Sequence, residues 1–342
     1  MSWTFQPALT AIGGVRKDWE ALNRSRHILL DPGFVEPLVR HFGDADLVLG
    51  AGHNGTKSWL ALLTRKSTGL WETFQPSQSP LGLIVTSDPD ASGEQLLEAT
   101  KRLPGYALQL SIMQQDPDYT SFPPVSGRAE FQYMDYIRTA RLPLEGTFDA
   151  YWSSRGSNLR HNLARRGRRM KEKGLSAELI AFEKPEEVAE AIREYGRLES
   201  LGWKGKNGTA VSENNAQGRF YRDVFEHFCS LGEATIYQYR LNGKVAASDL
   251  CLRRDSMMIV LKTAYDEELD EFSPALQMRR DITEQLFAGQ QVRVVEFYGR
   301  VMDWHTRWTD QVRTMYHVNC FRHPWVENVK KVVKKFRGSH SE

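Results

Sequence analysis

The sequence is poor in cysteine and has no long apolar run. Its three cysteines, Cys229, Cys251 and Cys320, lie far apart among 342 residues and form neither a CxxC pair nor a metal-spaced cluster. This spacing argues against a disulfide framework and against a metal site, and it favours a reducing compartment. No apolar stretch is long enough to span a bilayer, and the N-terminal residues lack the basic region and apolar core of a secretory signal. We therefore expect a soluble, cytoplasmic protein.

An excess of one charge is also lacking. The 45 Lys and Arg residues against 43 Asp and Glu leave a formal net charge of only +2, which argues against a dedicated nucleic-acid-binding protein. Basic residues nevertheless crowd into one predicted helix at about 157–173. A solvated helix face is the default interpretation, but this density of basic residues also suggests an anionic contact, such as the CoA 3′-phosphate, an acidic glycan, a tRNA acceptor stem or a membrane surface. The basic residues are Arg155, Arg160, Arg165, Arg166, Arg168, Arg169, Lys171 and Lys173.

Local patterns predict a mixed α/β protein. The Asn54-Gly55 pair predicts a hairpin between strands at about 46–50 and 58–64, and Ser92 is the expected N-cap of a helix that ends near residue 102. Further helices are predicted at about 34–42, 186–200, 217–230, 274–287 and 329–336. Further strands are predicted at about 107–113, 132–139, 176–182, 234–239, 245–252, 257–264, 292–297 and 315–321.

The segment from Leu261 to Gln277 is the most informative part of the sequence. A strand here passes through an acidic loop into a helix whose first turn contains Pro274, with Ser273 as the expected N-cap. The free N–H groups and the positive dipole end of such a helix bind phosphates. The segment therefore predicts an anion-binding loop.

Several segments together resemble the FemAB-like, BioF2-type branch of the GNAT acetyltransferase superfamily, which is often labelled with cellulose biosynthesis. The resemblance covers roughly residues 147–310. It rests on 159–166 (LRHNLARR), 199–205 (ESLGWKG), 208–210 (GTA), 243–247 (GKVAA), 261–266 (LKTAYD), 272–274 (FSP) and 295–299 (VEFYG).

The resemblance implies a GNAT-type mixed sheet flanked by helices. It implies a GNAT acyltransferase domain in residues 146–342, with the basic helix and a helical tail, and we expect a second GNAT-like half in residues 1–145. The implied activity is transfer of an acyl group, with acetyl expected, from acyl-CoA to an amine, such as an amino sugar in glycan or metabolite synthesis. The cosubstrate would be acetyl-CoA or another acyl-CoA, without a metal.

The resemblance also implies roles for individual residues. The strand residues Lys262, Thr263 and Ala264 would contact the amide-rich arm of CoA, and residues 273–277 would bind its pyrophosphate. The acceptor would meet Trp203, Lys204 and Arg160. The pyrophosphate-loop residues are Ser273, Pro274, Ala275, Leu276 and Gln277.

Acyl transfer to an amine needs a base for the ammonium proton and a donor for the thioester oxyanion. Asp249 and Glu296 interrupt apolar strands, where burial would raise the pKa of each carboxyl, and Glu199 precedes the aromatic loop at Trp203. Tyr298 is the candidate acid for the leaving thiolate, and His305 is a further candidate base.

Three positions depart from the family pattern. Ala275 stands where the family usually has glycine, and Glu296 where it usually has aspartate. The family's usual lysine before an Arg-Trp pair is missing, since Trp304 and His305 precede Arg307-Trp308. Two alternatives stay open: a FemAB-type transferase that uses aminoacyl-tRNA, and a non-catalytic binding protein on the same fold. The acceptor's identity and the oligomeric state are not fixed by the sequence.

Overall fold

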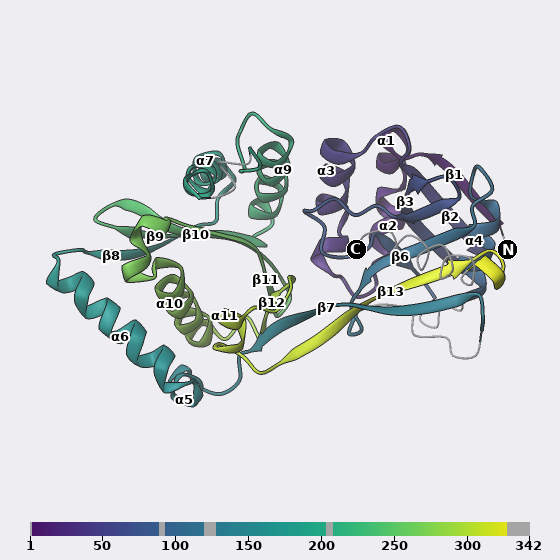
Figure 1. The fold of residues 1–342 in the computed structure, drawn as a ribbon. Coiled ribbons are helices and arrows are strands. Elements are labelled where there is room, and N and C mark those ends of the chain that lie inside the picture. Colours follow the sequence, from purple (N-terminus) through teal and green to yellow (C-terminus); the bar gives the residue numbers. More distant parts are fainter. Residues whose placement is uncertain (1, 89–92, 120–127, 203–207, 327–342) are drawn as a thin grey trace, which may run out of the picture. The chain divides into compact units, whose positions relative to one another are not determined.

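The computed structural model describes residues 2–88, 93–119, 128–202 and 208–326, and it divides the chain into two compact units (Figure 1). The first unit contains residues 1–137 and 314–342, and the second contains residues 138–313. This division differs from the expected ranges 1–145 and 146–342, because strand β13 (Val312–Phe321) leaves the second unit and pairs with β6 (Gln109–Gln115) of the first.

The first unit is a sheet with helices around it. Its strands pair in the order β1–β2–β3–β4–β6–β13, and β5 also pairs with β3. The strands not yet given are β1 (Ser2–Pro7), β2 (Val48–Asn54), β3 (Lys57–Ser67), β4 (Leu70–Thr73) and β5 (Ile84–Thr86). The helices are α1 (Ala8–Ala11), η1 (Ile12–Val15), α2 (Arg16–Leu22), η2 (Ile28–Leu30), α3 (Pro32–Phe42) and α4 (Gly93–Arg102).

The predicted hairpin at Asn54-Gly55 is confirmed. Asn54, the last residue of β2, pairs with Lys57, the first residue of β3. Gly55 between them has the positive φ of 61° that a tight turn requires. One apolar face of this sheet packs against α4 through buried side chains that include Trp59, Leu96 and Leu110. The expected N-cap Ser92 lies outside the described residues, and so does the helix expected at 329–336.

The second unit begins within β7 (Phe131–Pro143), at residue 138. It ends at the start of β13, at residue 313. Its helices are α5 (Phe148–Ser154), α6 (Ser157–Glu172), α7 (Pro185–Leu201), α9 (Ala216–Ser230), η3 (Glu267–Phe272), α10 (Pro274–Gly289) and α11 (Asp303–Thr306). Its other strands are β8 (Ala177–Phe182), β9 (Ala234–Leu241), β10 (Lys244–Arg254), β11 (Met257–Tyr265) and β12 (Val294–Phe297).

The sheet of the second unit is mixed. Its strands pair in the order β7–β12–β11–β10–β9–β8, and all neighbours are antiparallel except β11 and β12, which are parallel. Helices α7 and α9 cover one face, and α10 covers the other (Figure 1). Together with the first unit, this arrangement confirms the predicted mixed α/β class with a mixed sheet flanked by helices.

Helix α9 forms where the apolar spacing predicted it. Asn215 caps the helix by accepting a hydrogen bond from the Gly218 amide at 2.9 Å. The apolar residues recur every three or four positions and are buried against the sheet. They are Phe220, Tyr221, Val224, Phe225 and Phe228.

The basic helix α6 contacts the rest of the unit through an apolar face and through a charged face. Leu159, Leu163 and Met170 are buried. On the charged side, Arg169 and Lys173 lie 2.7 and 2.9 Å from the carboxylate of Glu271 in η3. Helix α6 therefore fixes η3, the segment that leads into α10.

Candidate functional site

Strands β11 and β12 part in the middle of the sheet. They pair only over Met257–Ile259 and Val294–Glu296, after which β12 ends at Phe297 and β11 continues to Tyr265. In the described part of the chain no other strand pairs with this side of β11, so the backbone of residues 260–265 is open to a ligand. A cavity of about 690 Å³, the main cavity, is lined by this part of β11, the start of α10 and residues 297–305.

Helix α10 begins at the main cavity. Ser273 occupies the N-cap position with a left-handed φ of 49°, but its side chain makes no capping bond and its hydroxyl donates to the Asp270 carbonyl instead. The expectation of a side-chain cap is therefore wrong. Pro274 has no N–H, and the Leu276 and Gln277 amides donate to the Ser273 carbonyl. No described residue accepts from the Ala275 amide, which lies in the cavity wall at the positive end of the helix.

Lys262 forms a buried cluster under helices α7 and α9. Its ammonium lies 3.0 Å from the Glu199 carboxylate and 5.9 and 5.3 Å from the ring centres of Tyr195 and Tyr221. Glu199 also accepts a 2.7 Å hydrogen bond from the Val211 amide. The Tyr195 hydroxyl donates to Glu199 as well, at 3.4 Å. Of Lys262 and Glu199, Lys262 lines the main cavity and Glu199 does not.

Asp249 lies on the opposite face of the sheet, under α10. It accepts a hydrogen bond from the Thr263 hydroxyl, and its Oδ2 lies 2.7 Å from Arg279 Nη2. Burial raises the pKa of the Asp249 carboxyl above its usual range, and Arg279 opposes this rise. Asp249 is fully buried, while Arg279 and Thr263 line the cavity in front of it.

Glu296 is paired in the same way. Its Oε2 accepts a 2.9 Å hydrogen bond from Arg313 Nη1, and it is fully buried. The guanidinium of Arg313 also lies 5.5 Å from the ring centre of Tyr298. Tyr298 follows the end of β12 and lines the main cavity, whereas Glu296 does not.

His305 lines the cavity as a neutral hydrogen-bond donor. Its Nδ1 accepts from the Met302 amide at 3.0 Å, so the ring hydrogen is on Nε2. Burial lowers the pKa of His305 to about 4. The ring stacks on Trp304 with 3.6 Å between ring centres. At neutral pH this imidazole can donate from Nε2 but has no free nitrogen to accept a proton.

The main cavity thus gathers part of the predicted site. The predicted residues that line it are Lys262, Thr263, Ser273, Pro274, Ala275, Leu276, Tyr298 and His305. The predicted residues that do not line it are Ala264, Gln277, Glu199, Asp249, Glu296 and Arg160. Gln277 donates to the Leu163 carbonyl and Arg160 to the Arg155 carbonyl, and Trp203 and Lys204 lie outside the described residues.

Sequence reasoning missed the role of Arg279. Arg279 lies one turn into α10, is 4% exposed and pairs with Asp249. A signal was present, because a carboxylate inside an apolar strand requires a buried partner. The aromatic wall made by Phe297 and Trp304 was also not predicted.

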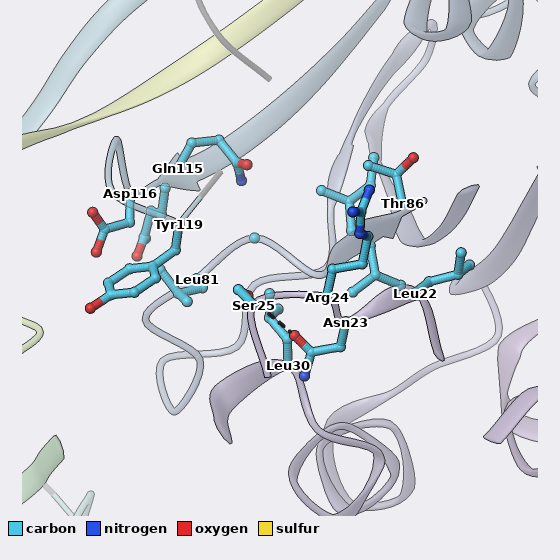
Figure 2. Close-up of a pocket in the computed structure, with 14 residues that line it drawn as sticks. Leu22, Asn23, Arg24, Ser25, Leu30, Leu81, Thr86, Gln115, Asp116 and Tyr119 are labelled. Carbon is cyan, nitrogen blue, oxygen red and sulfur yellow. Dashed lines mark hydrogen bonds between the residues drawn. The ribbon is translucent and has the colours of Figure 1, made fainter. Parts of the chain in front are cut away.

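A second, much smaller pocket lies in the first unit (Figure 2). Its volume of about 60 Å³ suits only a few water molecules. Figure 2 shows the Ser25 hydroxyl directed to the Asn23 side chain, to which it donates at 3.4 Å. This pocket is too small to hold a substrate.

Within the described residues, no three His, Cys, Asp or Glu side chains come together to hold a metal ion. None of the described helices combines the length and apolarity needed to cross a membrane.

Comparison with known proteins gives a family match for part of the chain and similarities in fold for the whole. Residues 157–306 match the family described as acetyltransferase (GNAT) domain. The fold of the whole chain is similar to that of the C-terminal domain of a protein named as a lysylphosphatidylglycerol synthetase from Agrobacterium fabrum. The TM-score is 0.58 at 12% identity, covering 95% of this chain and 97% of that one.

FemX is similar with a TM-score of 0.57 at 11% identity, covering 96% of this chain and 100% of that one. A conserved protein of unknown function from Bacteroides thetaiotaomicron is similar with a TM-score of 0.50 at 11% identity, covering 94% of this chain and 100% of that one. No curated protein sequence matches the chain. At these identities the similarity concerns the fold, and a GNAT-like nature of the first unit stays a prediction. Residues 157–306 of the second unit therefore match a GNAT domain, and the fold of the whole chain is similar to that of FemX.

Proposed function

We propose that the second unit transfers an acyl group from an acyl-CoA to an amine at the main cavity. The observation that carries this proposal is the parting of β11 from β12 directly in front of the start of α10. An extended ligand with amide groups can pair with the open backbone of residues 260–265 as a strand would. Its phosphates then reach the Ala275 amide at the positive end of α10.

The charges on the cavity wall favour an anionic donor. Lys262, Arg279 and Arg300 line the main cavity, and Asp270 is the single carboxylate among the lining residues. Glu199 and Asp249 balance Lys262 and Arg279 from behind the wall, so the cavity itself meets mainly cationic groups. Positive groups attract the phosphates of the donor and also favour the uncharged form of an amine beside them. A deprotonated acceptor amine needs no strong base in the cavity, which agrees with the paired state of Asp249 and Glu296.

The transfer step needs a proton donor more than a further carboxylate. The amine nitrogen attacks the thioester carbon, the new C–N bond forms, the C–S bond breaks, and the amine loses a proton while the thiolate gains one. His305 Nε2–H is a hydrogen-bond donor in the cavity wall that could stabilise the oxyanion. Tyr298 is a hydroxyl donor in the same wall that could protonate the thiolate.

The amine acceptor would enter from the face under α7 and α9, where Lys262 lies. An amino sugar from glycan or metabolite synthesis is the proposed acceptor class, and acetyl is the proposed acyl group. The protein would act in the cytoplasm, where acyl-CoA is present.

A thermal-shift series tests the donor. Acetyl-CoA, longer acyl-CoAs and free CoA are added to the purified chain at a hundred times their dissociation constants, where binding to the native state stabilises by about 2.7 kcal/mol. We expect CoA and acyl-CoA to raise the melting temperature. A chain that is not stabilised by any of them, at concentrations up to several millimolar, does not use acyl-CoA.

The second candidate is a FemAB-type aminoacyl-tRNA-dependent transferase. The whole-chain similarity in fold to FemX favours it. Such an enzyme would lose its activity on treatment with ribonuclease and would not be inhibited by desulfo-CoA, whereas an acyl-CoA-dependent enzyme shows the opposite pattern.

A further inference from the structure

A separate cavity lies beside the start of α10. It has a volume of about 530 Å³ and lies between the end of α5, the first turns of α6, and residues 306–310. We call it the basic pocket. Leu276 lines both cavities, and Asp270, which lines the main cavity, accepts a 3.1 Å hydrogen bond at its carbonyl from Arg166 of the basic pocket. A ligand bound at the start of α10 therefore lies next to the basic pocket.

Three arginines line the basic pocket, and their charges are only partly neutralised. Arg155 lies 3.7 Å from Asp310, a carboxylate whose side chain is 86% exposed. Arg166 donates to a backbone carbonyl, which carries no net charge. Arg307 is exposed and makes no hydrogen bond or ion pair with any described residue. Three guanidinium groups and one carboxylate leave a net charge of about +2 in this pocket.

The start of α6 adds to this positive field. Its N-cap is Gly156, which has no side chain to cap the first amides. Gly156, Asn158 and Leu159 of this helix start line the pocket. The positive dipole end of the 16-residue helix thus meets the same space as the three guanidinium groups.

We propose that the basic pocket binds a terminal phosphate monoester carried by the donor on its ribose, and that it makes the protein prefer CoA to dephospho-CoA. A phosphate monoester carries about −1.5 to −2 charges near neutral pH, which matches the net charge of the pocket. Arginine binds such oxygens through paired N–H donors. The apolar side chains of Leu159, Leu163 and Leu276 give the adjoining nucleoside a surface to rest on. This inference rests on the proposed use of acyl-CoA.

The distribution of charge on α6 favours a single phosphate over an RNA backbone. Arg169 and Lys173 are already paired with Glu271, and Arg166 belongs to the pocket. Arg168 is exposed and does not line the pocket. The cations of this helix therefore do not form one continuous row along which a nucleic-acid strand could lie.

The test compares the affinities of CoA and dephospho-CoA for the native chain with their affinities for the variant Arg307→Ala. Because Arg307 is exposed and makes no described contact, this variant should fold, which its melting temperature checks. Calorimetry should show CoA affinity reduced at least tenfold, about 1.4 kcal/mol, with dephospho-CoA affinity changed less than twofold. Arg168→Ala, which removes the same charge from helix α6 outside the pocket, should change neither affinity.

Each other outcome overturns a distinct statement. Equal affinity of the native chain for CoA and dephospho-CoA, or equal losses for both ligands in Arg307→Ala, overturns the phosphate assignment and leaves the proposed function standing. If neither ligand binds the native chain, the proposed function fails and the pocket assignment fails with it. If an RNA hairpin with a tRNA acceptor end binds, loses its affinity in Arg307→Ala, and CoA does not compete with it, the pocket receives an RNA phosphate and the assignment to a monoester is wrong.

Discussion

Arg279 Nη2 lies 2.7 Å from Asp249 Oδ2, so a guanidinium in the cavity wall covers a carboxylate that does not line the cavity. Such a pair is sensitive to the loss of one partner, because the remaining charge stays buried without compensation. The pair thus links the folding of the sheet to the shape of the main cavity.

Asp249→Asn should therefore act mainly on stability. We expect the free energy of unfolding to fall by about 3–5 kcal/mol, since Arg279 loses its counter-charge in a buried position. Urea unfolding measures this loss. Glu226→Gln, which breaks the exposed pair with Arg222, should cost less than about 1 kcal/mol. A stable Asp249→Asn protein with turnover reduced a hundredfold would instead support Asp249 as the base.

The Lys262–Glu199 pair should show strong coupling. Lys262→Met and Glu199→Gln each leave one buried polar partner unmatched and should each destabilise by about 3–5 kcal/mol. The double variant should recover much of this loss, because no uncompensated charge remains. A double-mutant cycle by urea unfolding gives the coupling energy. Additive losses would show that the two side chains do not interact in solution.

Ala275 should control binding of the donor phosphates. Ala275→Asp places a negative side chain at the start of α10, and CoA affinity should fall at least tenfold, which is about 1.4 kcal/mol. The helix should persist, because acidic residues are favourable in a first turn. Ala275→Asn has nearly the same shape without the charge, so it should retain most of the affinity. Unchanged CoA binding in a folded Ala275→Asp protein would place the phosphates elsewhere.

Tyr298 should contribute to the chemical step. Tyr298→Phe removes the hydroxyl that could protonate the leaving thiolate, and turnover should fall by about a hundredfold while CoA affinity stays the same. Glu296→Gln serves as the comparison variant, because Glu296 does not line the cavity and accepts a hydrogen bond from Arg313. We expect Glu296→Gln to lower stability more than turnover. Near-normal turnover of Tyr298→Phe would remove Tyr298 as the acid.

His305 should make the fold sensitive to acid. Its pKa is about 4 in the folded chain and about 6.5 when unfolded, so the unfolded chain gains a proton first as the pH falls. The stability that the neutral ring contributes is complete above pH 6.5 and declines toward pH 4, by at most about 1.4 kcal/mol per pH unit. His305→Gln should flatten this part of the stability curve. Parallel curves for the two proteins would contradict the lowered pKa.

Much of the second unit follows from local sequence patterns. Helices α6, α9 and α10 lie close to their predicted ranges, because apolar spacing and Pro274 act within a few residues. The turn at Asn242-Gly243 has the positive φ angles of 48° and 80° that the sequence pair indicates. In contrast, β1, α1, α2, β4, β5, α5 and α11 were not predicted, since they are short or depend on their neighbours for burial.

The candidate site was predicted less well, because partners in space are not close in sequence. Asp249 was correctly expected to be buried, yet its partner Arg279 comes from a helix on the other side of a hairpin and a loop. Glu199 and Lys262 are separated by two strands and a helix, and their pairing could not be read from either segment. The tautomer of His305 follows from one backbone amide, that of Met302, and its lowered pKa follows from burial.

The sequence by itself determined the longer helices such as α6, α9 and α10 and the hairpin turns, because each depends on residues close together in the chain. It also carried the GNAT resemblance, through the order of short segments between residues 147 and 310. The tertiary structure decided which of the candidate residues reach a ligand. It decided this through the parting of β11 and β12, the pairing of buried carboxylates with Arg279 and Arg313, and the gathering of Arg155, Arg166 and Arg307 around one pocket. Burial and ion pairing join residues as distant in sequence as Arg155 and Asp310, and only the packed chain brings them within reach of one another.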